Sequence, residues 1–135
     1  MPIPFLACMI AASAFYHLPP RLLPAIQAVE GGRVDTVSRN TNGSEDLGVM
    51  QVNTRWVPIL ARYTGASNEA TRTRLIGDGC FNIAAAGAIL RTYLNETEGN
   101  VMLAVSYYHS HTPERGQGYL ARVMRSATTL FGPSR

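Results

Sequence analysis

Glu30 is the acidic residue whose position best suits it to donate a proton. Residues 22–29 carry apolar side chains at helical spacing, and Gly31 and Gly32 follow Glu30 directly. Because glycine readily adopts the left-handed conformation that ends helices, Glu30 is predicted to be the last side chain of a buried helix. The helix dipole and an apolar setting both raise the pKa of a carboxyl group there, which favours the protonated form that a general acid needs. In the alternative interpretation, Glu30 bends out to solvent at the helix end.

Two pairs of residues elsewhere are the other candidates for chemistry. Cys8 and Cys80 are either two buried free thiols or a disulfide. A disulfide would close a long loop, stabilise the fold by about 4 kcal/mol and indicate an oxidising compartment. His109 and His111, with Glu114 nearby, offer too few ligands for zinc, which takes about three or four. We therefore predict no metal and no other cofactor.

The composition indicates one globular domain over residues 1–135 with a mild preference for anionic partners. Hydrophobic residues make up 46% of the chain and charged residues 16%. The formal net charge is +3, and all 12 basic residues are arginines without a run or stripe. This scatter favours a partner such as an acidic cell-wall polymer and gives no reason to expect nucleic acid. No apolar run is long enough to span a bilayer, so we expect no stable membrane insertion.

The elements that must position Glu30 are predicted to be helices, which makes the fold class all-α. Apolar residues recur at steps of three and four over 5–16, from about 20 to 30, and over 54–64, 68–77, 80–94, 101–109 and 119–131. The segment 33–53 is rich in turn formers and is expected to be an irregular loop with short extended pieces, and 112–118 is expected to be a polar loop. On the helix over 54–64, the side chains expected to face the core are Trp56, Ile59, Leu60 and Tyr63.

The apolar stretch from Ile3 to Ala14 loosely resembles a signal peptide but lacks a positively charged n-region. Its helical pattern continues through Phe15 and Tyr16. We interpret it as the first helix of the fold and expect any signal peptide to be absent from this chain.

Four blocks of the sequence, in the right order, resemble the lysozyme-like lytic transglycosylases. The first is the helix that ends in Glu30. The most specific is Asn42-Gly43-Ser44-Glu45-Asp46-Leu47-Gly48-Val49-Met50-Gln51-Val52-Asn53, similar to the family's serine-containing loop followed by Gly-Leu-Met-Gln. The other two are Cys80-Phe81-Asn82-Ile83 before an alanine-rich helix and Ala104-Val105-Ser106-Tyr107-Tyr108-His109. Tyr119 and Val123 are in addition similar to the family's final Tyr-Val pair. The similarity is closest to the small specialised members that accompany type III and type IV secretion systems and pili.

The resemblance implies a compact lysozyme-like helical domain, classed as α+β among lysozymes, with an irregular segment after the catalytic helix. It implies a periplasmic or exported enzyme that cuts the β-1,4 bond between N-acetylmuramic acid and N-acetylglucosamine in peptidoglycan strands. Glu30 would be the single acid/base. It would protonate the glycosidic oxygen and then take the proton of the muramic 6-hydroxyl, which attacks the anomeric carbon and gives a 1,6-anhydro product. Secretion or pilus apparatus proteins are the implied partners.

Four further residues receive roles in substrate binding from the resemblance. Ser44 would position the substrate's N-acetyl group or the reacting hydroxyl, although a turn serine is an equally good interpretation. Met50 and Gln51 would form a wall of the sugar groove, although Gln51 would also suit a buried amide satisfied by backbone. Tyr108 would hold Glu30 in place, because a phenol can hydrogen-bond a carboxyl oxygen without removing its proton.

The resemblance also implies a Cys8–Cys80 disulfide, and it has departures near the site. Gly31 stands where the family commonly has serine, His109 replaces an asparagine, and His111 replaces a glycine. The sequence also leaves two alternative functions open. The first is a muramidase that uses water.

In that muramidase, Glu45 or Asp46 would act as the second carboxylate. The other alternative is a catalytically weak domain kept as a peptidoglycan-binding assembly component, which the two histidine substitutions motivate.

Overall fold

The fold is mostly helical, as predicted, in a computed structural model that describes residues 2–132. The helices are α1 (Leu6–Phe15), α2 (Leu22–Glu30), α3 (Val57–Thr64), α4 (Asn68–Gly77), α5 (Gly79–Glu96), α6 (Val101–His109) and α7 (Pro113–Phe131), with a 3-10 turn η1 (Thr54–Trp56). The strands β1 (Val37–Arg39), β2 (Glu45–Leu47) and β3 (Val52–Asn53) form one antiparallel sheet in the order β1-β2-β3. Within these residues no helix is both long and apolar enough to cross a membrane.

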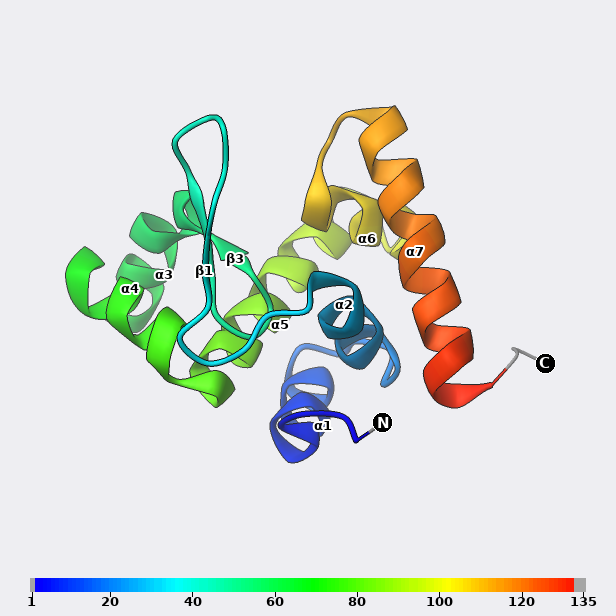
Figure 1. The fold of residues 1–135 in the computed structure, drawn as a ribbon, viewed down its shortest axis with the longest axis horizontal. Helices are drawn as coiled ribbons and strands as arrows, with labels where there is room; N and C mark the ends of the chain where they lie inside the picture. The colour runs from blue at the N-terminus through cyan, green and yellow to red at the C-terminus, as the bar shows by residue number, and fades with distance from the viewer. Residues whose placement is uncertain (1, 133–135) are drawn as a thin grey trace.

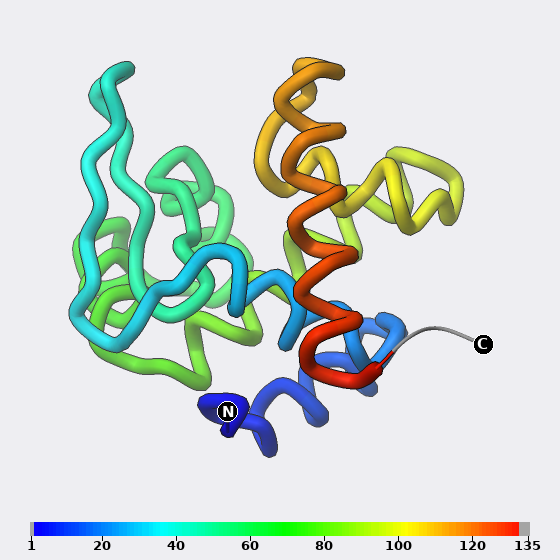
Figure 2. Tube along the Cα trace, turned by 45° about the vertical axis from the view of Figure 1, so that its right-hand side comes forward, coloured from blue at the N-terminus to red at the C-terminus, as the bar shows by residue number. Residues whose placement is uncertain are grey.

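Helix α5 crosses the middle of the molecule, and several other helices pack against it (Figure 1). It contacts α4 toward one end, α6 toward the other and α1 along its side. Its predicted apolar stripe is confirmed, since Ile83, Gly87, Leu90 and Leu94 are all buried. Helix α7 runs along the edge of the molecule in Figure 1, lies in front of the other elements in Figure 2, and packs against both α2 and α6. Segments from the beginning and the end of the chain therefore lie side by side.

The segment after Glu30 forms the small sheet rather than an irregular loop alone. In the sheet, Val37 pairs with Leu47 and Asp46 pairs with Asn53. Strands of two or three residues are too short to show an alternating pattern, which explains why the sequence indicated only extended pieces.

One buried side chain joins this sheet segment to α5. Asn82 has 0% exposure. Its Nδ2 donates to the carbonyls of Leu47 and Leu75, each at 2.8 Å, and its Oδ1 accepts the N–H of Met50 at 2.7 Å. Because buried polar atoms must be paired, this amide fixes the position of the sheet segment relative to the helical part.

The prediction of a polar loop over 112–118 is wrong, because α7 begins at Pro113. Proline is favoured in the first turn of a helix, where its missing N–H costs nothing, and Glu114 there suits the positive end of the helix dipole. Gly116 lies inside the helix, where a Cβ atom would come within 3.0 Å of the Cβ of Ser106 on α6. The glycine that suggested a loop instead allows two helices to approach closely.

The predicted inward face of α3 is also wrong in part. Leu60 is buried with Val57 and Ala61, but Ile59 is 46% exposed and Tyr63 is 63% exposed. The helix therefore turns an apolar strip toward solvent, on the side opposite to the core.

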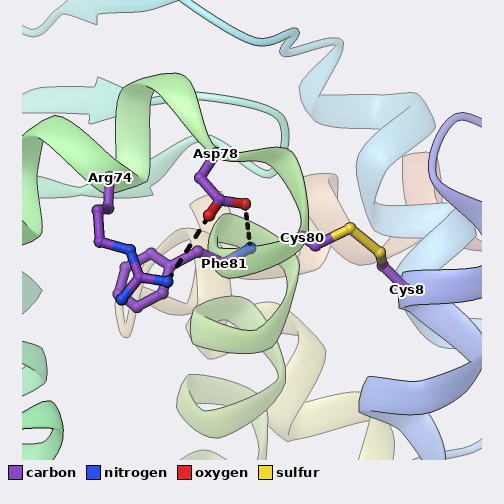
Figure 3. Close-up of a disulfide and its surroundings, with 5 residues drawn as sticks. All are labelled: Cys8, Arg74, Asp78, Cys80 and Phe81. Carbon is purple, nitrogen blue, oxygen red and sulfur yellow. Dashed lines mark hydrogen bonds and ion pairs between the residues drawn. A yellow bond between two sulfur atoms is a disulfide. The ribbon is translucent and has the colours of Figure 1, made fainter.

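The predicted disulfide is present between Cys8 on α1 and Cys80 in the first turn of α5 (Figure 3). The two Cα atoms are 5.4 Å apart, and the bond closes a loop of 72 residues. Next to it, the carboxylate of Asp78 accepts the N–H of Phe81 at 3.0 Å and caps α5, while the guanidinium of Arg74 lies 3.9 Å from the centre of the Phe81 ring. The start of α5 is thus fixed both covalently and by capping.

Candidate active site

Glu30 is the last residue of α2, as predicted. The body of that helix is buried, with Leu23 and Ile26 at 0% exposure. Gly31 follows in the left-handed conformation with φ 68°. Gly32 lies so close to the sheet segment that a Cβ atom on it would be 2.0 Å from the carbonyl oxygen of Gly48. The two glycines therefore end the helix and bring the backbone that follows Glu30 against the segment that follows β2.

Glu30 lines a cleft of about 630 Å³. The turn between β1 and β2 borders it on one side and the turn between α6 and α7 on the other (Figure 1). Three arginines, Arg39, Arg55 and Arg115, line it together with polar side chains from both turns. The cleft is a polar groove with one acid at the end of an apolar helix.

The hydroxyl that holds Glu30 belongs to Tyr119 on α7. It donates to the Glu30 carboxyl group at 2.7 Å, and the tyrosine side chain is 1% exposed. Burial raises the pKa of Glu30 to about 7, opposed by the Tyr119 hydrogen bond and the charge of Arg122 and reinforced by the charge of Asp46. A carboxyl group with this pKa is partly protonated at neutral pH, which is the state a general acid needs.

The prediction that Tyr108 holds Glu30 is therefore corrected. Its hydroxyl donates to the backbone carbonyl of Met50 at 2.8 Å, although Tyr108 does line the groove. The prediction of Met50 as a groove wall is corrected as well, because its side chain has 0% exposure and belongs to the core. The Tyr108–Met50 hydrogen bond joins α6 to the sheet segment.

Gln51 and Ser44 both line the groove, as predicted for substrate-binding residues. Gln51 has a positive φ of 54°, and its Nε2 donates to the carbonyl of Gly48 at 3.0 Å. The Ser44 hydroxyl donates to Oδ1 of Asn42 at 2.6 Å and accepts from an amide of Asn53 at 3.0 Å. Both side chains thus have the backbone or turn contacts of the alternative interpretation, and their roles toward a substrate stay predictions.

Of the two acids considered for a second carboxylate, only Asp46 lines the groove. Its Oδ1 accepts from the side-chain amide of Asn53 at 3.0 Å. Glu45 instead forms an ion pair with Arg72 at 2.8 Å. A second carboxylate in this groove is therefore Asp46.

The two histidines make different contacts. His109 stacks on the ring of Tyr119, with centroids 4.9 Å apart and the planes within 7° of each other, and burial lowers the pKa of its imidazole. His111 lies 3.0 Å from the carboxylate of Glu96 and stacks on Tyr107 with centroids 3.9 Å apart. Over residues 2–132, no three His, Cys, Asp or Glu side chains are grouped as metal ligands would be.

The model of the transglycosylase SLT domain family matches residues 7–128. The chain belongs to this family. SLT domains are lytic transglycosylases that act on peptidoglycan, a polymer outside the cytoplasm. No curated protein matches the chain. The match includes every residue that lines the groove of this SLT domain.

The functional residue that sequence reasoning missed is Tyr119. The sequence indicates it only as half of a Tyr-Val pair. In the structure Tyr119 and Val123 are the two buried side chains of one α7 face. A tyrosine on an apolar stripe is the available signal, because a buried hydroxyl needs a hydrogen-bond partner.

Proposed function

We propose that this SLT domain cleaves the bond between N-acetylmuramic acid and N-acetylglucosamine with Glu30 as its single acid/base. The protonated carboxyl group of Glu30 donates its proton to the glycosidic oxygen as the bond to the anomeric carbon breaks. The carboxylate so formed takes the proton of the muramic 6-hydroxyl, whose oxygen bonds to the anomeric carbon. The product carries a 1,6-anhydro ring, no water is consumed, and Glu30 ends in its starting state.

The observation that carries the proposal is the contact between Glu30 and Tyr119. The carboxyl group is desolvated enough to raise its pKa to about 7, so it holds the proton it must donate. The Tyr119 hydroxyl, at 2.7 Å, is a neutral donor whose own pKa is raised by burial, so it does not compete for that proton. Hydrogen bonds to charged acceptors are the stronger ones, so this contact strengthens when the carboxylate forms.

The substrate-binding roles of Ser44, Gln51 and Tyr108 belong to the same proposal. Their place along the groove supports it, because a sugar chain lying there would pass all three. Gln51 and Tyr108 also fix the groove wall through backbone carbonyls, at 3.0 and 2.8 Å. Removing either should raise KM more than it lowers kcat.

A second candidate is a muramidase that uses water, and Asp46 is the observation that favours it. A carboxylate accompanying a general acid across a glycoside groove is the arrangement of ordinary glycosidases. Asp46 lines the groove with Glu30, and its charge acts on the pKa of Glu30.

Product analysis separates the two reactions. Peptidoglycan is digested with the wild type, Glu30→Gln and Asp46→Asn, and the fragments are weighed by mass spectrometry, since anhydro ends are lighter than reducing ends by one water. We expect anhydro ends from the wild type and from Asp46→Asn, and none from Glu30→Gln. Reducing ends alone would establish the muramidase, and no release by the wild type would favour a binding component.

We also propose that the chain works in the periplasm for a secretion or pilus apparatus. The disulfide between Cys8 and Cys80 supports an oxidising compartment. Crosslinking in whole cells, followed by mass spectrometry of the captured proteins, tests the partner. Recovery of envelope-spanning secretion or pilus components is expected, and recovery of general cell-wall enzymes alone would contradict it.

A further inference from the structure

A second cavity of about 250 Å³ lies beside the groove, and we call it the side pocket. It lies among the end of α1, η1, α3 and α5, and its aromatic lining consists of Tyr16, Trp56 and Tyr63. Trp56 and Ile89 line both the side pocket and the groove. The two cavities therefore share a wall and lie next to each other.

The walls of the side pocket are apolar side chains left open to solvent. Tyr63 is 63% exposed and Ile59 is 46% exposed, and the hydroxyl oxygens of Tyr63 and Tyr16 are 3.4 Å apart. Apolar and aromatic side chains grouped around a hollow can pack against an apolar group of a ligand. This is the strip of α3 that the apolar pattern had assigned to the core.

Arg91 is the one charged residue among those lining the side pocket. Its Nε is buried without a hydrogen-bond partner, so the donors left for a ligand are the terminal nitrogens, of which Nη1 reaches only the side chain of Asn95, at 3.5 Å. Within residues 2–132 it forms no ion pair. A guanidinium group with free donors beside aromatic rings is suited to a carboxylate.

We propose that the side pocket binds the stem peptide that peptidoglycan strands carry on muramic acid. A small aliphatic residue of the peptide packs on Tyr63 and Tyr16, and a peptide carboxylate pairs with Arg91. The proposal rests on the proposed function, because it takes the substrate to be peptidoglycan. The shared wall at Trp56 and Ile89 places the peptide branch next to the sugar chain in the groove.

A stem peptide suits the side pocket better than a further sugar ring. The ring hydroxyls of a sugar are neutral and would leave the guanidinium group of Arg91 without a counter-charge. The stem peptide combines methyl side chains with carboxylates, and it branches from the strand beside the bond that is cut. Both features match a pocket with apolar walls and one cation.

The test compares three substrates: strands with intact stem peptides, strands whose peptide carboxylates are amidated, and strands freed of peptide by an amidase, with the lactyl carboxylate that this exposes capped as an amide. The wild type should cleave intact strands about fivefold faster than amidated strands, the gain of one partly exposed ion pair, and faster still than peptide-free strands, which also lose the apolar contact. In Arg91→Gln the preference over amidated strands should disappear. In Tyr63→Ala the preference over peptide-free strands should fall to about fivefold, the part due to Arg91. Arg62→Gln, on the exposed face of α3 outside the pocket, is the matched control and should keep both preferences.

A binding measurement keeps this test separate from the fate of the proposed reaction. Glu30→Gln, with and without Arg91→Gln, is sedimented with intact and with peptide-free cell-wall sacculi. Weaker sedimentation of the double variant with intact sacculi alone would support the side pocket even if the wild type released no product. Equal losses on all substrates would identify a sugar site, and unchanged preferences in both pocket variants would show an unused surface; either result overturns the proposal.

Discussion

Each of the two walls of the groove carries a carboxyl group, and the two groups have different surroundings. On the helical wall, Glu30 ends a buried helix and has one neutral hydroxyl donor, from Tyr119. On the sheet wall, Asp46 lies on a short strand and accepts a side-chain amide from Asn53 on the next strand. Packing by apolar helices raises the pKa of the first group to about 7, and the polar sheet offers the second group hydrogen bonds suited to a carboxylate. The apolar surroundings of Glu30 are what allow this carboxyl group to keep its proton near neutral pH.

The largest change comes from removing the acid of the helical wall. Glu30→Gln should lower product release by about 10³-fold, because general acid catalysis is lost. It should also stabilise the fold at alkaline pH. The folded-state pKa of about 7 lies above the ordinary value of 4.5, so ionisation of Glu30 costs stability as the pH rises through that window. Thermal unfolding should show a gain of about 1–2 kcal/mol at pH 8 and no gain at pH 4. An equal gain at both pH values would show that the effect is not ionisation.

The close contact between the end of α2 and the sheet segment can be disrupted at Gly32. A Cβ atom there would lie 2.0 Å from the carbonyl oxygen of Gly48 and 2.7 Å from that of Val49, and neither backbone group can move aside cheaply. Gly32→Ala should cost about 3 kcal/mol or more in urea unfolding. Gly118→Ala is the control, because that glycine lies inside α7 with nothing within 4 Å of its Cβ position. It should add about 0.5–1 kcal/mol, and similar losses in both variants would refute the close approach.

The two tyrosines of the groove should separate in a pH-rate profile. The hydrogen bond from Tyr119 lowers the pKa of Glu30, so Tyr119→Phe should move the alkaline limb of kcat/KM to higher pH and lower the rate about tenfold at the optimum. Tyr108→Phe should leave that limb in place, because its hydroxyl contacts Met50 instead. A limb that moves in Tyr108→Phe and stays in Tyr119→Phe would reverse the assignment.

The smallest expected effect lies on the sheet wall. The charge of Asp46 raises the pKa of Glu30, so Asp46→Asn should move the alkaline limb to lower pH by less than about one unit across this solvated groove. The product should keep its anhydro ends. Glu45→Gln is the matched control, because its ion pair with Arg72 lies outside the groove. Loss of most activity in Asp46→Asn would give the sheet wall a direct part in the chemistry.

The longer helices and the helix end at Glu30 were predictable from the sequence, because the local apolar pattern specifies them. The place of Glu30 followed from an apolar stripe and two glycines, and the long α5 followed from its own stripe. The sheet did not follow, because its strands have two or three residues and Asn82, far along the chain, fixes their place. The start of α7 was missed since Gly116 reads locally as a turn, and only the neighbouring helix shows why it is there.

Pairing across the chain was the part of the site that local patterns did not specify. By residue type alone, a tyrosine on α6 and one on α7 could each hydrogen-bond the groove acid. Only the packing of α7 on α2 makes Tyr119 the partner of Glu30. In the same way the apolar strip of α3 gives no sign that Ile59 and Tyr63 face solvent. Which face of a helix is buried depends on neighbours that a single segment does not reveal.

The acid and the hydroxyl that holds it are separated by 89 residues, one near the start of the chain and one on its last helix. A polypeptide still emerging from the ribosome, or one clipped before α7, holds Glu30 without Tyr119 and without the packing that shields its proton. Under the proposed mechanism the acid is therefore complete only once both ends of the domain have packed together, so a fragment that ends before α7 should not cut peptidoglycan.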